Sequence, residues 1–515
     1  MKERFGRNIL TVGGLTGISR ILGYIRDMVT AWLLGATGLA DAFFIAYRIP
    51  NLLRRIMGEG AITIAVVPVF NEVKEKEGLE KAFKMAESVF TLMFISLVII
   101  TIIGELIAPG LVALLAFGKI NTGDFQVAVH LTRIMFPFIL LIGIVSLFMG
   151  ILNSVGHFAA PAGAPILLNI FMIGIPVIFY VWYPFFSSPA DALAWGVIAG
   201  GVAQILLQLP QLKRYKVPIR FNADFRDKNI RQVTRLMGIA AIGASIYQIN
   251  VLVGTQLASF LKTGSISFLY YAQRLLELPL GIFAFAVGNV MLPAMSSASA
   301  RMDNTELSSL ISRSIVMVLV FTVPSSVALV ILAEPVTAVL FMRGAFTIAD
   351  AKETAYALQM YSISLWAIGY VRILNQALYS MQEAKTVVNI GWMALVVNVA
   401  MSLLLMFFMR HAGIALASSI SVFFQLIIFH FILTRKQIKF SMSLYRDCLK
   451  IITASFIMGI VLYLFILHNF WQHGLNTNSL IMLSACIIAG TVAYFAVLYI
   501  SGIRPAKFFS QRRVH

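Results

Sequence analysis

Long apolar runs alternate with short polar segments along almost the whole chain. Two of the clearest runs are Val89–Ile103 and Ile451–Leu467. With their flanks they reach the ~20 residues that an α-helix needs to cross a bilayer. A membrane-spanning β-strand would alternate apolar and polar positions, whereas these runs are continuous. Because lipid leaves only helices and closed barrels able to satisfy the backbone, the pattern predicts an all-α polytopic membrane protein.

The runs predict about fourteen transmembrane helices. Their centres fall roughly at residues 20, 55, 97, 140, 170, 200, 245, 280, 323, 366, 397, 422, 458 and 489. The first apolar stretch is interrupted by Arg20 and Arg26 and is followed by no small-residue cleavage site. We therefore expect it to be a retained first helix rather than a signal peptide.

Lysine and arginine are concentrated in alternate connections and at both ends of the chain. The segments 71–84, 213–235 and 435–450 are rich in them. The other connections carry few basic residues, namely Lys119, Lys262, Arg343, Lys352 and Arg410. The positive-inside rule therefore predicts that both termini are cytoplasmic.

Composition agrees with a membrane protein and narrows its function. Of the 515 residues 59% are hydrophobic and 12% are charged, and the mean hydropathy is +0.88. The net charge of +18 is explained by the topology of the loops, so we do not expect nucleic acid as a partner. The two cysteines, Cys448 and Cys486, have no disulfide or metal-binding spacing.

An internal repeat emerges at an offset of 226 residues, the distance from Gly17 to Gly243. The same shift places Ala46 and Arg48 on Ala272 and Arg274. Each repeat holds six spans, an even number, so the two should be related by an axis along the membrane normal. We predict an N-terminal six-helix lobe (1–212), a pseudo-symmetric C-terminal lobe (213–437) and two additional helices (438–515). Paired lobes are typical of secondary transporters.

Several basic residues remain inside the predicted spans, where a charge costs at least ~2.5–3.5 kcal/mol on insertion scales. They are Arg20, Arg26, Arg48, Arg54, Arg55, Arg133, Arg274 and Arg372. Arg133 and Arg372 lie near span ends, where snorkelling is an equal alternative. Nearby acids are Asp27, Asp41, Glu59 and Glu277. The arginines outnumber them, which favours a net-positive cavity for an anionic substrate, because guanidinium groups bind phosphate with forked donors.

Sequence motifs for enzymatic chemistry are absent. The chain has no phosphate-binding GxxxxGK[ST] loop, no H-E-x-x-H and no nucleophile elbow. The histidines are scattered without ligand spacing, so we expect no metal site and no cofactor. An embedded enzyme that uses Asp41 or Glu59 is the remaining enzymatic alternative.

Five motifs resemble the MurJ/MviN family over essentially the whole chain. They are Ser19-Arg20-Ile21-Leu22-Gly23, Arg26-Asp27, Asp41-Ala42-Phe43-Phe44, Pro50-Asn51-Leu52-Leu53-Arg54-Arg55 with Gly58-Glu59-Gly60-Ala61, and Tyr270-Tyr271-Ala272-Gln273-Arg274-Leu275. The resemblance implies a flippase for lipid II, the lipid-linked peptidoglycan precursor, working by alternating access in the bacterial inner membrane. It also implies membership of the multidrug/oligosaccharidyl-lipid/polysaccharide exporter superfamily. Cell-wall synthesis proteins are partners that the sequence does not identify.

The resemblance further implies which residues form the site. Arg20, Arg26, Asp41, Arg54, Arg55 and Arg274 would line a cavity that holds the pyrophosphate and the sugar-peptide headgroup. Glu59 would be an ion-pair partner. Some relatives carry an acid immediately before the Arg274 position, where this chain has Gln273, so we expect their local ion pair to be missing here. A membrane potential or an ion gradient is the expected energy source.

Other functions stay open at this point. A related flippase could carry another polyprenyl-pyrophosphate-linked glycan, such as an O-antigen or capsule unit, with nearly the same cavity chemistry. A drug exporter of the same superfamily is disfavoured by the excess of arginine. A non-transporting scaffold for cell-wall enzymes would tolerate loss of the arginines.

Overall fold

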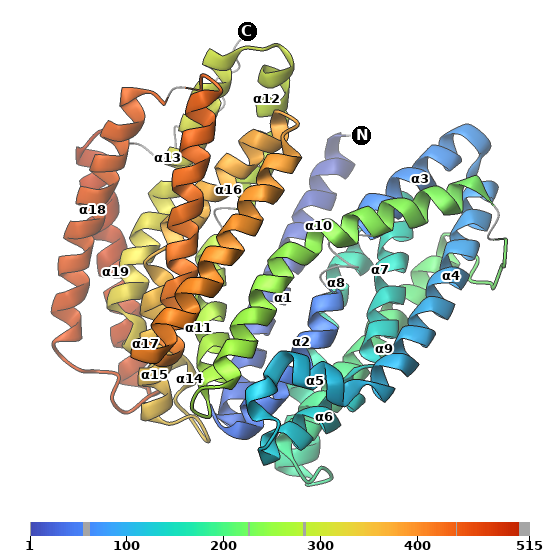
Figure 1. The fold of residues 1–515 in the computed structure, drawn as a ribbon, viewed down its shortest axis with the longest axis horizontal. Coiled ribbons are helices and arrows are strands. Elements are labelled where there is room, and N and C mark those ends of the chain that lie inside the picture. The colour runs from blue at the N-terminus through green and yellow to red at the C-terminus, as the bar shows by residue number, and fades with distance from the viewer. Residues whose placement is uncertain (1, 55–61, 225–226, 282–284, 439, 504–515) are drawn as a thin grey trace. The chain divides into compact units, whose positions relative to one another are not determined.

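The computed structural model describes residues 2–54, 62–224, 227–281, 285–438 and 440–503. In these ranges the chain forms nineteen α-helices and no strand, so the predicted all-α fold is confirmed (Figure 1). The chain divides into two compact units, 1–263 and 264–515.

The first unit contains ten of the α-helices. They are α1 (Lys2–Leu34), α2 (Gly38–Arg54), α3 (Ile62–Glu77), α4 (Leu79–Leu106), α5 (Ala108–Ala116), α6 (Gly123–Met135), α7 (Phe138–Ser154), α8 (Ala159–Pro176), α9 (Pro189–Arg214) and α10 (Lys228–Ser259). A 3-10 turn, η2 (Phe117–Lys119), follows α5, and a π-helical segment, η3 (Val177–Trp182), extends α8. Helix α1 packs on α8, and α10 packs on α3, α5 and η2.

The second unit contains the other nine. They are α11 (Ser265–Pro279), α12 (Phe285–Ala300), α13 (Asn304–Ile331), α14 (Ala333–Phe341), α15 (Ile348–Ser362), α16 (Leu365–Ser380), α17 (Ala384–Arg435), α18 (Met442–Ile466) and α19 (Thr477–Ile500). Within α17 the backbone of Arg410 departs from helical geometry, with φ 52° and ψ −132°, so this helix is two segments joined at a kink.

Helix boundaries repeat at the offset found in the sequence. Shifted by 226 residues, α1 covers 228–260 and α10 spans Lys228–Ser259; α4 covers 305–332 and α13 spans Asn304–Ile331. Helices α8 and α9 map onto the two segments of α17 on either side of Arg410. Helices α18 and α19 come after the second copy. The predicted lobe boundaries at 212 and 437 follow this repeat, whereas the packing of α10 extends the first compact unit to 263.

Eight of the described helical stretches are long and apolar enough to cross a membrane. One is the kinked α17, which holds two predicted centres. Other predicted spans are divided between consecutive helices: α11 ends at Pro279, just before the predicted centre at residue 280. Helices α1 and α10 carry charges that lower their hydropathy. The centre at residue 55 lies outside the described residues.

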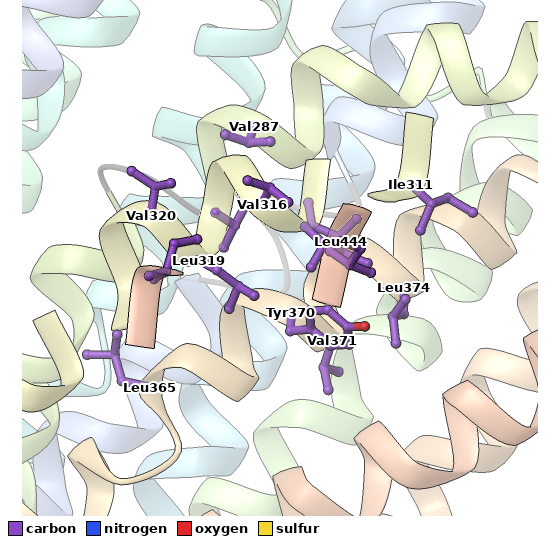
Figure 2. Close-up of a cluster of buried hydrophobic side chains, with 14 of the residues drawn as sticks. Val287, Ile311, Val316, Leu319, Val320, Leu365, Tyr370, Val371, Leu374 and Leu444 are labelled. Atoms are coloured by element: carbon purple, nitrogen blue, oxygen red, sulfur yellow. The ribbon is translucent and has the colours of Figure 1, made fainter. Parts of the chain in front are cut away.

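Close packing holds each unit together, because in lipid the hydrophobic effect does little to associate helices. In the first unit a Cβ on Gly200 of α9 would lie 2.9 Å from the Cα of Leu168, so glycine lets α8 and α9 approach closely. In the second unit Figure 2 shows Val316 and Leu319 of α13 with Leu374 of α16, and all three are buried.

The two additional helices are fixed to the second unit through α13. Helix α18 packs along α13 and α19 packs along α18 (Figure 1). The buried hydroxyl of Tyr494 on α19 donates a hydrogen bond of 2.6 Å to the carbonyl oxygen of Val320. Other side chains of these helices, such as Phe456 and Ile500, are largely exposed, as expected for surfaces that face lipid.

Candidate functional site

Arg26 of α1 is a buried arginine held by hydrogen bonds to Asp27 and Asn169. Its Nε and Nη2 donate to Asp27 Oδ1 at 3.1 and 2.7 Å, and its Nη1 donates to Asn169 Oδ1 of α8 at 3.1 Å. The amide of Asn169 in turn donates to the carbonyl oxygen of Ser19 at 3.0 Å. Arg26 and Asp27 are 7% and 3% exposed. The guanidinium group is therefore fixed in one orientation. A fixed orientation is what an anion needs in order to accept hydrogen bonds from two N–H groups of a planar guanidinium.

Arg20 lies six residues before Arg26, which is about 9 Å along the helix. It is exposed and forms no ion pair with a described residue. Arg20 thus adds positive charge to α1 that no described carboxylate neutralises, in contrast to the paired Arg26.

Arg54 ends α2 and is half-buried, and its Nε donates to Asn51 Oδ1 at 3.1 Å. Earlier on the same helix, Arg48 Nη1 donates to the carbonyl oxygen of Val251 in α10 at 3.3 Å. The predicted site residues Arg55 and Glu59 lie outside the described residues.

Asp41 has a different setting from the arginines. It lies in the first turn of α2, is fully buried, and its Oδ2 is 3.9 Å from Lys119 Nζ. Lys119 is 4% exposed and also lies 3.5 Å from Asp124 Oδ2 and 3.2 Å from Thr263 Oγ1. Asp41 therefore belongs to a buried ion cluster of the first unit, and its predicted contact with substrate stays a prediction.

Next to this ion cluster, at one corner of the first unit, η2 is joined to the end of α10 by hydrogen bonds and close backbone contacts. The Phe117 amide donates to Gln256 Oε1 at 3.0 Å, and the Gly118 amide donates to Ser259 Oγ at 3.1 Å. A Cβ on Gly118 would lie 2.7 Å from the backbone of Ser259. Only glycine fits this approach without a shift.

Arg274 lies on α11 in the second unit. Its Nη1 donates to Glu277 Oε2 at 2.9 Å, its Nε and Nη2 lie 3.3 Å from the Tyr270 hydroxyl, and its guanidinium carbon is 5.2 Å from the centre of that ring. Gln273 stands where some relatives carry an acid, and Arg274 pairs instead with Glu277, one turn later on the same helix. The side chain is 21% exposed.

Sequence reasoning missed Asn169 and the role of Lys119. A signal existed for each. Asn169 is a polar residue inside the apolar stretch of α8, and Lys119 is one of the few basic residues in a connection otherwise poor in them. No group of three or more potential metal ligands comes together within the described residues.

A family model described as "Lipid II flippase MurJ" matches residues 30–486. The chain is 35% identical over 505 residues to the probable lipid II flippase MurJ of Buchnera aphidicola subsp. Acyrthosiphon pisum, covering 97% of this chain and 98% of that protein. It is 32% identical over 514 residues to the lipid II flippase MurJ of Burkholderia cenocepacia, covering 98% of each.

Solved structures give a consistent picture. A structure of the lipid II flippase MurJ in an inward closed conformation has a TM-score of 0.78 and 27% sequence identity, and covers 95% of this chain and 98% of that one. An inward-facing multidrug resistance MATE family transporter of the MOP superfamily has a TM-score of 0.69 at 14% identity, over 81% of this chain and 94% of that one. This second likeness concerns the fold alone.

Proposed function

This chain belongs to the MurJ family of lipid II flippases, a family of multi-pass membrane transporters, and we propose that it moves lipid II from the cytoplasmic to the outer leaflet of the bacterial inner membrane. The alternation of basic and nearly uncharged connections supports cytoplasmic termini. Peptidoglycan synthesis is the process that such an activity serves.

The observation that carries the proposal is the set of arginines on apolar helices in both units. A buried guanidinium is retained at Arg26, and Arg274 is held in a fixed pose by Glu277 and Tyr270. Each is paired with an acid, so net positive charge comes from Arg20, to which Arg55 would add. A pyrophosphate is matched by such donors, since guanidinium groups form charge-assisted, forked hydrogen bonds.

Alternating access is the mechanism that we infer for this site. The arginines bind the anionic headgroup on the cytoplasmic side, and the polyprenyl tail stays in the bilayer while the headgroup crosses. After the headgroup is released outside, the site carries a net positive charge. The membrane potential then drives this charge back toward the cytoplasm, because moving one charge across the membrane is worth ~2.3 kcal/mol per 100 mV. Asp41 supports this cycle from within the buried cluster with Lys119, and Glu59 stays a predicted ion-pair partner of the arginines.

Growth rescue tests the function. In bacteria depleted of their own lipid II flippase, we expect the wild-type gene to restore growth. Arg274→Ala removes charge-assisted hydrogen bonds worth ~1.5–3 kcal/mol each, so transport should fall by about 10- to 100-fold and rescue should fail. Arg133→Ala is the control, since it removes an exposed arginine of α6.

Each outcome of the rescue has a distinct meaning at matched membrane expression. Wild-type failure would contradict lipid II as substrate and point to another polyprenyl-linked glycan. Full rescue by Arg274→Ala would contradict the proposed site.

A further inference from the structure

A polar pocket of about 460 Å³ lies in the second unit, where α13 and α18 begin and α17 has just ended. Its size falls in the range of small-molecule sites. Eight of its twelve lining residues carry a hydroxyl or an amide side chain. The lining residues are Asn304, Thr305, Ser308, Ser309, Ser312, Arg313, Val316, Gln437, Ser441, Ser443, Leu444 and Asp447.

The local sequence explains why three helix ends meet here. The Asp303 side chain caps α13 by accepting from the Glu306 amide, and the Ser441 hydroxyl caps α18 by accepting from the Ser443 amide. Gln437 follows the end of α17 with a left-handed φ of 63°. The strongly apolar parts of α13 and α18 both follow the pocket along the chain, which places the pocket at the level of one membrane interface.

One buried hydroxyl in the wall has no partner. Ser312 is 7% exposed, and its Oγ forms no hydrogen bond to a described residue. The next serine of the helix, Ser314, instead donates to the Leu310 carbonyl at 2.7 Å, the usual arrangement within a helix. Ser312 also lines the pocket, so rotation of its hydroxyl toward a ligand there would satisfy it.

Two opposite charges from different helices also line the pocket. Arg313 of α13 is exposed, and Asp447 of α18 is half-buried. Neither forms an ion pair with the other or with another described residue. A ligand with a negative and a positive group would match both, whereas a simple anion would meet repulsion from Asp447.

In the first unit, the position that the internal repeat relates to this pocket is covered by the chain itself. Helix α4 is the repeat counterpart of α13, and the connection after α9 lies across it. Phe221 packs against Phe90 and Phe94 with ring centres 5.5 and 5.3 Å apart, and the Asn222 amide donates to Thr91 Oγ1 at 2.8 Å. In the second unit the chain continues into α18 instead, and the polar pocket remains.

We propose that this pocket binds the headgroup of a zwitterionic phospholipid. Arg313 and Ser312 hold the phosphate, and Asp447 holds the ammonium group. The interface level of the pocket suits a bilayer lipid, whose acyl chains continue along the apolar helices. This site is separate from the proposed lipid II site and does not depend on it.

Lipid titration of the purified full-length protein, followed by non-denaturing mass spectrometry, tests the site. We expect phosphatidylethanolamine to bind, and Arg313→Gln and Asp447→Asn each to weaken it roughly tenfold. Ser312→Leu, which fills the pocket, should weaken it as well. The control is Arg301→Gln, an exposed arginine that pairs with Glu306 outside the pocket and should leave binding unchanged.

Two further ligands separate the sources of affinity. Phosphatidylglycerol lacks the ammonium group, so its binding should be weaker, and Asp447→Asn should strengthen it by removing the repulsion. Glycerophosphoethanolamine lacks the chains and should compete at high concentration if the headgroup is recognised. Equal binding of both phospholipids, unchanged binding in the pocket variants, or no competition at ~1000-fold excess would each overturn the proposal.

Discussion

Replacing Arg26 by leucine should abolish growth rescue, and adding Asp27→Asn to the same chain should not restore it. The single change leaves the Asp27 carboxylate buried without its guanidinium, and losing one partner of a buried ion pair costs ~3–5 kcal/mol. The second change removes that buried charge while keeping the shape of the side chain. If Arg26 binds the headgroup, transport needs the guanidinium itself and the double variant stays inactive.

Thermal unfolding in detergent separates the two roles of Arg26. We expect Arg26→Leu to lower the melting temperature and the double variant to recover part of the loss, with membrane levels measured in parallel. A double variant that both recovers stability and rescues growth would show that Arg26 is only a structural partner of Asp27. That result would remove Arg26 from the substrate site.

Replacing Lys119 by methionine should destabilise the first unit by about 3–5 kcal/mol. Lys119 is buried within 3.9 Å of Asp41 and 3.5 Å of Asp124, so its loss leaves two carboxylates without their shared ammonium group. Thr263, just beyond α10, would also lose a hydrogen bond. Adding Asp41→Asn should recover part of the stability, because it removes the fully buried charge.

The matched control for Lys119 is Lys262→Met, which changes an exposed lysine beside Thr263. Thermal unfolding of the three variants and wild type measures the effect. Equal melting temperatures for Lys119→Met and Lys262→Met would contradict a stabilising ion cluster at this corner.

The all-helical fold could be predicted because lipid imposes a strict rule on the backbone. Each long apolar run has to satisfy its own hydrogen bonds, and only a helix does so locally. The repeat could be predicted because the offset from Gly17 to Gly243 persists, and it places α1 on α10 within a residue at the helix ends. The break within α17 could be predicted as well, because Arg410 lies in a connection between the predicted centres at 397 and 422, and the backbone departs from helical geometry there.

The arginines could be found from sequence because a charge in an apolar run is costly and therefore conspicuous. Their partners could not all be found. Glu277 was among the available acids because it is one turn from Arg274, whereas Asn169 is 143 residues from Arg26 and becomes its neighbour only when α8 packs on α1. The pocket beside Ser312 depends equally on tertiary packing, since its walls come from α13 and α18.

The most direct test of the central claim is exposure of lipid II at the outer leaflet. In cells depleted of their own flippase and expressing this chain, an externally added hydrolase that cleaves only outward-facing lipid II should release headgroup. We predict release at the level of undepleted cells with wild type, and at the background level with the Arg26→Leu/Asp27→Asn variant. Background release with correctly inserted wild-type protein, or full release with the variant, would contradict the account.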